Sequence, residues 1–387
     1  MQRISPKAFI IAARRSAIGR IGGIHRQRRI EDLTAPIIIK ALADAKLSPA
    51  DVDHIVLGNA TAGGNPARLV ALASGLPDSA PATTIDRQCA SGLEAIAQAH
   101  LLISAGEAKI VVAGGMESLS TAPWRVARPR NPYLMPHFVG HDQGEGMGLS
   151  RLVDAAETVA QRFQITRKRQ DAYAAETRQR ALTAEEAKQF VHEIAALEPE
   201  RREAMDESLA SVLDLDELAE LPVFREPDGT VTQGNAASMH DGAAIIVMVS
   251  AEILKSLGKV PALAVLGAVS CGAAAGEEAT ASIEALRKLK ARVNGALPER
   301  LPLVELNEAS AAEAIAFRDC LGIAETALNP DGGALARGYP FAAGSAVAAI
   351  RLFSRLVRRT ETAKHDVGVA VSGGLGGVGT AMALQRV

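Results

Sequence analysis

Cys89 is the residue of this chain whose type and position most clearly indicate chemistry. It lies in residues 86–93 (Asp-Arg-Gln-Cys-Ala-Ser-Gly-Leu), after a β-branched segment at 81–85 that predicts a short strand. Residues 93–103 have apolar side chains at helical spacing and contain no Gly or Pro, which predicts a helix. Free N–H groups and the dipole at a helix N-terminus favour a thiolate, so this position predicts a nucleophilic cysteine of lowered pKa. A buried structural cysteine is the alternative.

The two other cysteines, Cys271 and Cys320, do not extend this pattern. The three cysteines are odd in number and widely spaced, and they form neither a metal-binding motif nor a disulfide framework. We therefore expect no metal site, and a reducing, cytoplasmic location. Because Cys271 falls in a predicted strand and Cys320 in a predicted helix, core packing is the expected role of both, and Cys89 is expected to be the thiol that alkylating reagents reach.

The composition is that of a large globular protein. The chain has 387 residues, of which 48% are hydrophobic and 22% charged, enough for two domains or for one duplicated domain. Aromatic residues make up only 3%, so small aliphatic side chains must fill the core. A net charge of −2 gives no electrostatic footprint for nucleic acid or a membrane surface, and no apolar run reaches about 18 residues.

Strands and helices alternate on both sides of Cys89, which is typical of α/β layering. Before the middle of the chain the pattern predicts strands at 54–59 and 109–113 and helices at 33–45, 67–73 and 93–103. From about 118 to 241, prolines, arginines and isolated helical segments interrupt the alternation and indicate an insertion. After residue 243 it returns, with strands predicted at 262–270, 303–307 and 367–372 and helices at 281–291, 311–319 and 342–357.

The two alternating regions repeat each other at a nearly constant offset. Asn59 and Asn307 are 248 positions apart, and Cys89 and Tyr339 are 250 apart. Duplicated halves of this kind are expected to pack as two similar sheets about a shared axis. The helices that follow Cys89 and Tyr339 would then begin near one pocket.

Several segments resemble the thiolase family in order along nearly the whole chain. Residues 86–92 and 111–120 (Val-Val-Ala-Gly-Gly-Met-Glu-Ser-Leu-Ser) resemble its nucleophile region. Further matches lie at 58–59, 65–68, 228–232, 234–236, 307–309 and 329–340. The resemblance implies an α/β protein with a duplicated five-layer αβαβα thiolase fold and an inserted loop domain, normally dimeric or tetrameric. The implied parts are an N-terminal half at 1–117 plus 242–251, a loop domain at 118–241 that covers the CoA site, and a C-terminal half at 252–387.

The resemblance also implies which residues carry the chemistry. Thiolases use a nucleophilic Cys, a His in a Gly-His-Pro turn, a second Cys and an Asn; Cys89 matches the nucleophile and Asn307 the Asn. The turn here reads Gly-Tyr-Pro with Tyr339 at the His position, and Gly373 stands at the position of the second Cys. Tyrosine has an ordinary pKa of about 10 and is a poor base at neutral pH, but it can donate a hydrogen bond to an oxyanion or a thiolate.

Residues matching the CoA-binding segments of thiolases are Met147, Ala236, Ala237 and Ser310, with substitutions at and around them. Gly-Met-Gly stands around Met147 where many thiolases have His-Met-Gly, Ala237 replaces a Ser, and Ser310 replaces a Phe. His240 is the histidine nearest a family motif and is a candidate surrogate base, with a structural histidine as the alternative.

The sequence therefore predicts a thiolase-like acyl-CoA acyltransferase that acts through an acyl thioester on Cys89 with altered acid–base groups. The alternatives are an acyl-CoA hydrolase and a non-catalytic homologue that binds acyl-CoA or acts as a scaffold. Expected partners are an acyl-CoA or another acyl thioester and further copies of the chain, without nucleic acid or membrane. No cofactor is expected beyond the CoA thioester, which is a substrate.

Overall fold

The computed structural model describes residues 6–129, 131, 133–139, 149–198, 204–211, 213–274, 280–359 and 367–387. Within them, the strands are β1 (Ala8–Arg15), β2 (Gly19–Arg20), β3 (His54–Gly58), β4 (Ala82–Ile85), β5 (Ile110–Glu117), β6 (Arg125–Ala127), β7 (His137–Val139), β8 (His240–Ser250), β9 (Leu263–Gly272), β10 (Val304–Asn307), β11 (Val367–Gly374) and β12 (Val378–Arg386). The α-helices are α1 (Ile30–Asp44), α2 (Pro66–Ala73), α3 (Ser91–Ala105), α4 (Leu149–Arg162), α5 (Arg167–Glu186), α6 (Leu215–Ala219), α7 (Ala251–Ser256), α8 (Ala281–Val293), α9 (Ala311–Leu321), α10 (Ala334–Arg337) and α11 (Phe341–Phe353). None of these helices is long and apolar enough to cross a membrane.

The strands fall into two groups that follow the same order. In the first half, β4, β3 and β5 are parallel neighbours, and β8 and β1 continue the sheet antiparallel. In the second half, β10 and β11 are parallel, and β12 and β9 continue it antiparallel. A single parallel bridge between Val304 and Leu328 stands in the second half where β4 pairs with β3 in the first. The structure thus contains the internal repeat that the sequence predicts.

The two sheets are joined to each other by hydrogen bonds, which the sequence does not predict. Phe9 pairs with Ala264 and Ile10 with Leu263, so β1 and β9 connect the halves into one continuous strand order among the described residues. Only two residue pairs form this junction among the described residues.

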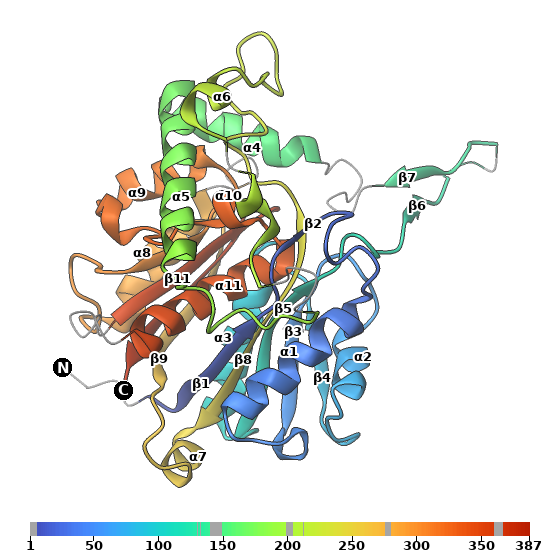
Figure 1. Ribbon diagram of the computed structural model, residues 1–387, viewed down its shortest axis with the longest axis vertical. Helices are drawn as coiled ribbons and strands as arrows, with labels where there is room; N and C mark the ends of the chain where they lie inside the picture. The colour runs from blue at the N-terminus through green and yellow to red at the C-terminus, as the bar shows by residue number, and fades with distance from the viewer. Residues whose placement is uncertain are drawn as a thin grey trace.

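Helices lie between the sheets and on both outer faces, which gives the five layers of the expected fold (Figure 1). The central layer consists of α3 and α11, which pack on each other and on strands of both halves. Helices α1 and α2 cover the outer face of the first sheet. Helices α8 and α9 cover the outer face of the second.

The central helices approach each other closely because small residues face each other across their contact. A Cβ atom on Gly92 would lie 2.6 Å from the Ala342 carbonyl oxygen, so only glycine fits there. The Leu93 amide donates to the Ser345 hydroxyl at 3.0 Å. Cys89 and Tyr339 precede these two helices, so this packing brings them to the same end of the central layer.

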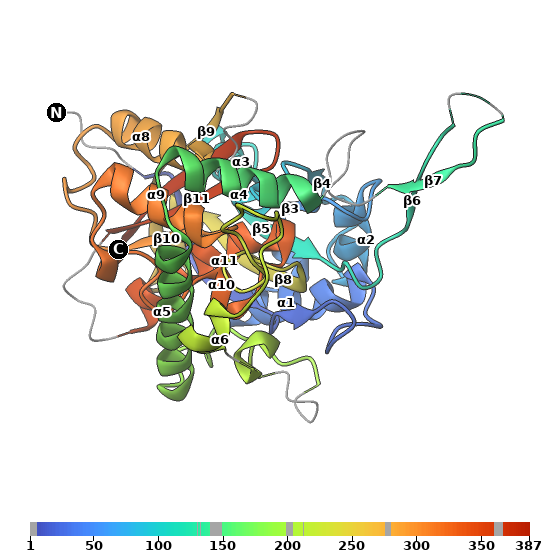
Figure 2. The same cartoon turned by 90° about the horizontal axis from the view of Figure 1, so that it is seen from above.

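Between β5 and β8 the chain leaves the sheets and covers one end of the molecule. A hairpin of β6 and β7 projects from the body in two perpendicular views (Figures 1 and 2). Helices α4, α5 and α6 pack over the second half, where α4 and α5 contact α9.

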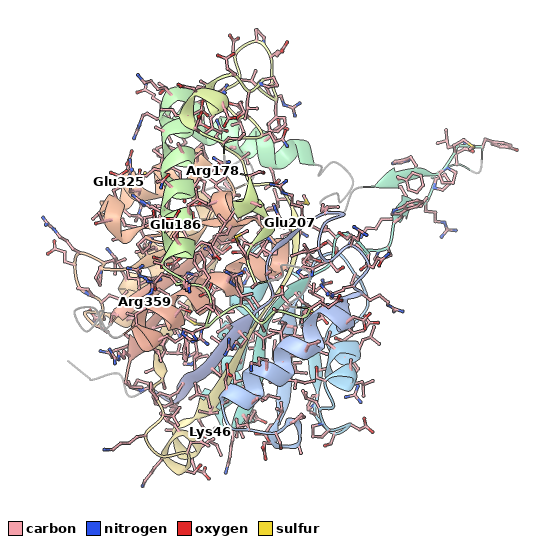
Figure 3. The ribbon with its side chains drawn as sticks, in the orientation of Figure 1. Lys46, Arg178, Glu186, Glu207, Glu325 and Arg359 are labelled. Carbon is pink, nitrogen blue, oxygen red and sulfur yellow. The ribbon has the colours of Figure 1, made fainter. Side chains whose placement is uncertain are left out.

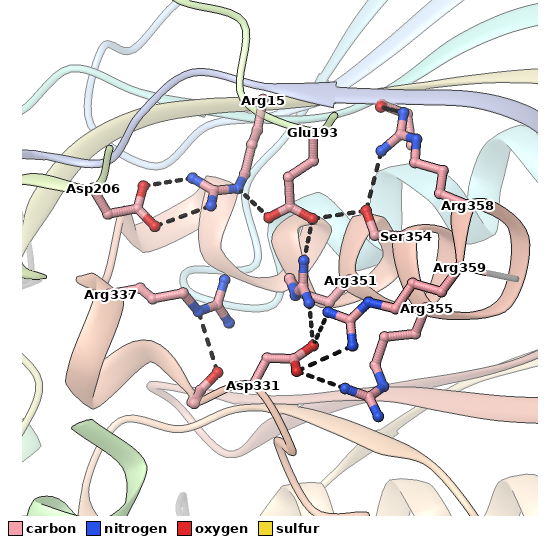
Figure 4. Close-up of polar contacts among 12 residues, drawn as sticks. Arg15, Glu193, Asp206, Asp331, Arg337, Arg351, Ser354, Arg355, Arg358 and Arg359 are labelled. Atoms are coloured by element: carbon pink, nitrogen blue, oxygen red, sulfur yellow. Dashed lines mark hydrogen bonds and ion pairs between the residues drawn. The ribbon is translucent and has the colours of Figure 1, made fainter. Parts of the chain in front are cut away.

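Buried ion pairs fasten the segment between β5 and β8 to both halves (Figure 4). Arg15 on β1 donates to Glu193 at 2.9 Å and to both oxygens of Asp206, at 2.6 and 3.0 Å. Arg351 on α11 binds both Glu193 and Asp331. Arg15, Glu193 and Arg351 are each 0% exposed, so the charges balance one another away from water.

Candidate active site

Cys89 lies in the short connection between β4 and α3, directly before the helix, as the sequence predicts. Gln88 has a φ of 53°, which turns the chain sharply ahead of the cysteine. The Ser91 hydroxyl accepts from the Arg87 amide at 2.7 Å and donates to the Gln88 carbonyl at 2.6 Å. These local bonds fix the backbone on both sides of the thiol.

The expected lowering of the Cys89 pKa is wrong, because the side chain is only 1% exposed. Burial raises the pKa of the Cys89 thiol to about 12 and outweighs hydrogen bonds from Tyr339 and the Leu375 backbone that favour the thiolate. The nearby Glu313 carboxylate raises it further. Resting Cys89 is therefore a neutral thiol.

The expected burial of the other two cysteines also fails. Cys320 is exposed on α9 and Cys271 is partly exposed on β9, while Cys89 is buried. Our expectation that alkylating reagents would reach Cys89 selectively therefore has no structural basis.

Tyr339 links Cys89 to Asn307. It is 1% exposed, and its hydroxyl is hydrogen-bonded to both the Cys89 sulfur and the Asn307 side chain. Burial and the neighbouring sulfur raise the pKa of Tyr339 well above its usual value, so the hydroxyl stays protonated and acts as a donor. Asn307 ends β10, and its side-chain amide also donates to the Ser372 hydroxyl at 3.3 Å. The predicted candidates Cys89, Tyr339 and Asn307 thus form one connected cluster.

A small cavity of about 30 Å³ borders this cluster. It is lined by Cys89, Leu152, Ala155, Ala156, Ala309, Ser310, Glu313, Tyr339, Gly373, Gly374 and Leu375. Gly373 lies within the extended backbone of β11, opposite Gly379. The predicted residues Cys89, Tyr339, Gly373 and Ser310 therefore meet at one place.

Glu313 is the ionisable group of this cavity that the sequence analysis missed. It lies in the first turn of α9, where its amide donates to the Ser310 hydroxyl at 3.1 Å and its carboxylate accepts from the Ala309 amide at 2.9 Å. Burial raises the pKa of Glu313 to about 7. The Ser-x-x-Glu spacing resembles an ordinary helix cap. The sequence signal that could have pointed to a role in the site is that Glu313 follows the candidate residue Asn307 by only six positions.

Ala236 and Ala237 lie beside the start of α9. Ala236 bridges to Ser310, and the Ala237 amide donates to the Ala309 carbonyl at 2.9 Å. Arg178, labelled on α5 in Figure 3, donates to the Gly234 carbonyl at 2.6 Å and steadies this loop. Met147, predicted with them as a CoA contact, lies outside the described residues.

His240 does not line the cavity, although it is close to Tyr339 in the fold. Its Nε2 lies 2.7 Å from the Ser208 hydroxyl and its Nδ1 lies 2.7 Å from the Ser238 carbonyl. Burial lowers the pKa of His240. Both ring nitrogens are engaged in structural contacts, which favours the structural alternative for this residue.

Asn59 occupies the position in the first half that Asn307 occupies in the second, but its polar groups are engaged. Its amide donates to the Met116 carbonyl at 3.1 Å and to Glu117 at 2.8 Å, and its oxygen accepts from the Ala62 amide at 2.9 Å. Burial raises the pKa of Glu117 to about 7. The hydrogen bonds of Asn59 therefore indicate a structural role in the first half of the repeat.

Comparisons with known proteins agree with this architecture along the whole chain. The sequence profile described as "Thiolase, N-terminal domain" matches residues 8–252, and "Thiolase, C-terminal domain" matches residues 245–386. The β-ketoadipyl-CoA thiolase of Pseudomonas putida is 34% identical over 404 residues, covering 98% of this chain and 99% of that protein. The acetyl-CoA acetyltransferase of Chromobacterium violaceum is 35% identical over 393 residues, covering 97% and 99%.

Solved structures are similar over the same extent. The acetyl-CoA acetyltransferase of Bacillus anthracis superposes with a TM-score of 0.89 at 29% identity, over 99% of both chains. Human mitochondrial 3-ketoacyl-CoA thiolase in complex with CoA superposes with a TM-score of 0.88 at 27% identity, over 99% of this chain and 98% of that one.

Proposed function

The chain belongs to the thiolase family, and on that premise we propose that it is an acyl-CoA acyltransferase in which Cys89 carries the acyl group as a thioester. The observation that carries this proposal is the buried, hydrogen-bonded cluster of Cys89, Tyr339 and Asn307 beside a cavity. Free cysteines support a cytoplasmic location as part of the same proposal. The proposed reaction requires no cofactor beyond the CoA thioester, which is its substrate.

Tyr339 and Asn307 have clear tasks in such a reaction. As the Cys89 sulfur bonds to the acyl carbon, the bond from that carbon to the CoA sulfur breaks, and the proton of the Cys89 thiol passes to the departing CoA sulfur. The Tyr339 hydroxyl donates to the Cys89 sulfur and stabilises the negative charge that forms on it. Once the acyl group is on the sulfur, this hydroxyl is available to the carbonyl oxygen that gains negative charge. The Asn307 amide, which bonds to Tyr339 and to Ser372, holds the hydroxyl in place. Ala236, Ala237, Ser310 and Met147 remain the proposed contacts of the CoA moiety.

The test of acylation is intact-mass spectrometry after incubation with acetyl-CoA and longer acyl-CoAs. We expect one acyl adduct per chain in the wild type and none in Cys89→Ala, with the adduct mapped to the peptide that contains Cys89. Cys320→Ser serves as the matched control and should still be acylated at Cys89. A protein that binds acyl-CoA without any adduct on Cys89 would instead be the non-catalytic homologue.

Hydrolysis of the acyl-enzyme is the second candidate function, and the cavity beside Cys89 favours it. A water molecule needs roughly 10–15 Å³ of such space. The cavity of about 30 Å³ therefore has room for a water molecule next to the sulfur. An acyl-CoA hydrolase would show steady release of free acid and CoA without a second thioester.

The projecting β6–β7 hairpin supports the proposal that copies of the chain associate. Trp124 is 82% exposed, Phe138 69%, and their rings meet edge to face with centroids 5.4 Å apart. Such apolar exposure away from the core indicates an interaction surface.

We expect light scattering to give at least a dimer, and Trp124→Ser with Phe138→Ser to lower the mass at a given concentration. Leu215→Ser, an exposed leucine on α6, should leave the mass unchanged. A wild-type mass of 40.4 kDa, that of one chain, at micromolar concentration would contradict association.

A further inference from the structure

The cavity beside Cys89 contains a carboxyl group and lacks a side chain where thiolases have one. Gly373, at the position of the family's second cysteine, lines the cavity and contributes no side chain to it. Glu313 lines the same space from α9. We propose that Glu313 accepts the proton of the nucleophile that attacks the Cys89 thioester, and that water is the nucleophile this cavity accommodates. This inference rests on the proposed acylation of Cys89.

The contacts of Glu313 hold the carboxylate in place without using all of its capacity. The Ala309 amide donates to Oε2, and Ser282 of α8 supplies a further hydrogen bond. An ionised carboxylate has about four acceptor sites, so a water in the cavity can also donate to it. The carboxyl group is therefore fixed by the first turn of α9 and still open to a reacting molecule.

The charges around Glu313 suit a group that takes up a proton near neutral pH. Glu313 interacts electrostatically with three ionisable groups, Glu308, Cys89 and Tyr339. Cys89 and Tyr339 are neutral at rest. Burial is the main cause that raises the pKa of Glu313 to about 7, and Glu308 adds to it. A base whose pKa lies near the working pH is the most effective one.

The remaining charged groups on the packed helices are committed elsewhere. Glu157 of α4 accepts from Thr230 at 2.7 and 2.8 Å. Tyr173 of α5 donates to Glu308 at 2.7 Å. Lys288 of α8 donates to the Ser270 carbonyl at 2.8 Å. None of these bonds is directed at the Glu313 carboxylate.

The proposed step balances with the groups present. Glu313 takes a proton from water as the water oxygen bonds to the thioester carbon. The carbon–sulfur bond then breaks, the acyl group leaves as the carboxylic acid, and the proton on Glu313 returns to the Cys89 sulfur. During this step Tyr339 donates to the oxygen that carries the negative charge. Water is consumed, and the thiol and the carboxylate are regenerated.

The experiment uses the full chain with Cys271→Ser and Cys320→Ser, so that Cys89 is the only thiol. p-Nitrophenyl acetate, which carries no CoA, is the acetylating probe, and peptide mapping checks that the acetyl group is on Cys89. Intact-mass spectrometry then follows loss of the acetyl group between about pH 5.5 and 9. Glu313→Gln is expected to slow deacetylation by roughly 10²–10⁴-fold. In the parent, the rate should fall as pH drops below about 7, because protonated Glu313 accepts no proton, and this dependence should vanish in Glu313→Gln.

Glu305→Gln is the matched control, since Glu305 is also buried and burial also raises its pKa to about 7, but it does not line this cavity. It should keep the pH dependence of the parent. Deacetylation of folded Glu313→Gln at the parent rate would overturn the inference. A deacetylation rate of the parent that does not fall below about pH 7 would overturn it as well, and that measurement requires no variant. Acetylation by p-nitrophenyl acetate but by no acyl-CoA would refute the proposed function alone. Failure of both reagents to acylate Cys89 would refute both.

Discussion

Tyr339→His combined with Gly373→Cys should raise the rate of acetoacetyl-CoA thiolysis by at least about 10²-fold over the wild type. General acid–base groups contribute roughly 10²–10⁴-fold each, and groups that act together are not additive. The structure favours the second change, because Gly373 is in extended backbone of β11 and faces the cavity of about 30 Å³ beside Cys89. Gly373 does not have a positive φ, so a cysteine at this position needs no left-handed backbone.

The two single variants are the controls for this restoration, and each should gain less than the double variant. A folded double variant no faster than the wild type would show that the pocket is built for a different reaction. Thiolysis by the wild type at rates ordinary for its relatives would contradict the prediction more directly. In that case another group, such as Glu313 in the same cavity, already supplies the base.

Glu193→Gln should lower the free energy of unfolding by about 3–5 kcal/mol, because it leaves Arg15 and Arg351 buried without the charge they share. The carboxylate accepts from Arg15, from Arg351 and, at 2.7 Å, from Ser354 (Figure 4). Urea unfolding monitored by circular dichroism measures the loss. Asp154→Asn is the control, because its ion pair with Arg225 is half exposed and such pairs are worth about 0–1 kcal/mol. Equal losses in the two variants would show that the buried network does not stabilise the fold.

The same network fixes how stability depends on acid. Arg351 and Arg15 hold the pKa of Glu193 at about 2 against the opposing effect of burial, below its value of about 4.3 in an unfolded chain. A lowered carboxyl pKa stabilises the fold at all pH values above the unfolded value and loses this effect as pH falls toward the folded value. The contribution of Glu193 should therefore stay constant at neutral pH and disappear between about pH 4 and 2.

The sequence predicts the fold well because the layers depend on local patterns. The β-branched residues before Cys89 form β4, and the apolar spacing that follows forms α3. The offset between Asn59 and Asn307 reveals the duplication. Each of these signals lies within a short segment or in the comparison of two such segments, and family membership follows from many of them in order.

The electrostatics of the site depend on burial, which no short segment reveals. The pKa of Cys89 rises because helices and strands from both halves exclude water from it, and this effect is larger than that of its hydrogen bonds with Tyr339 and Leu375. In the sequence, Glu313 has the pattern of a helix-cap residue. Only the fold, which places α9 beside Cys89, shows that Glu313 lines the cavity. Cys320 has the helical spacing of a core residue but faces outward. The catalytic roles of Asn307, Tyr339 and Gly373 stay predictions.

The proposed catalytic centre is assembled in the manner of a site shared between two subunits, although a single chain supplies both sides. Cys89 belongs to one half and Asn307, Tyr339 and Glu313 to the other, so neither half alone contains a complete reaction centre. Their alignment depends on how closely α3 and α11 approach each other at Gly92 and Ser345. The proposed activity therefore depends on the docking of the two halves as well as on the folding of each.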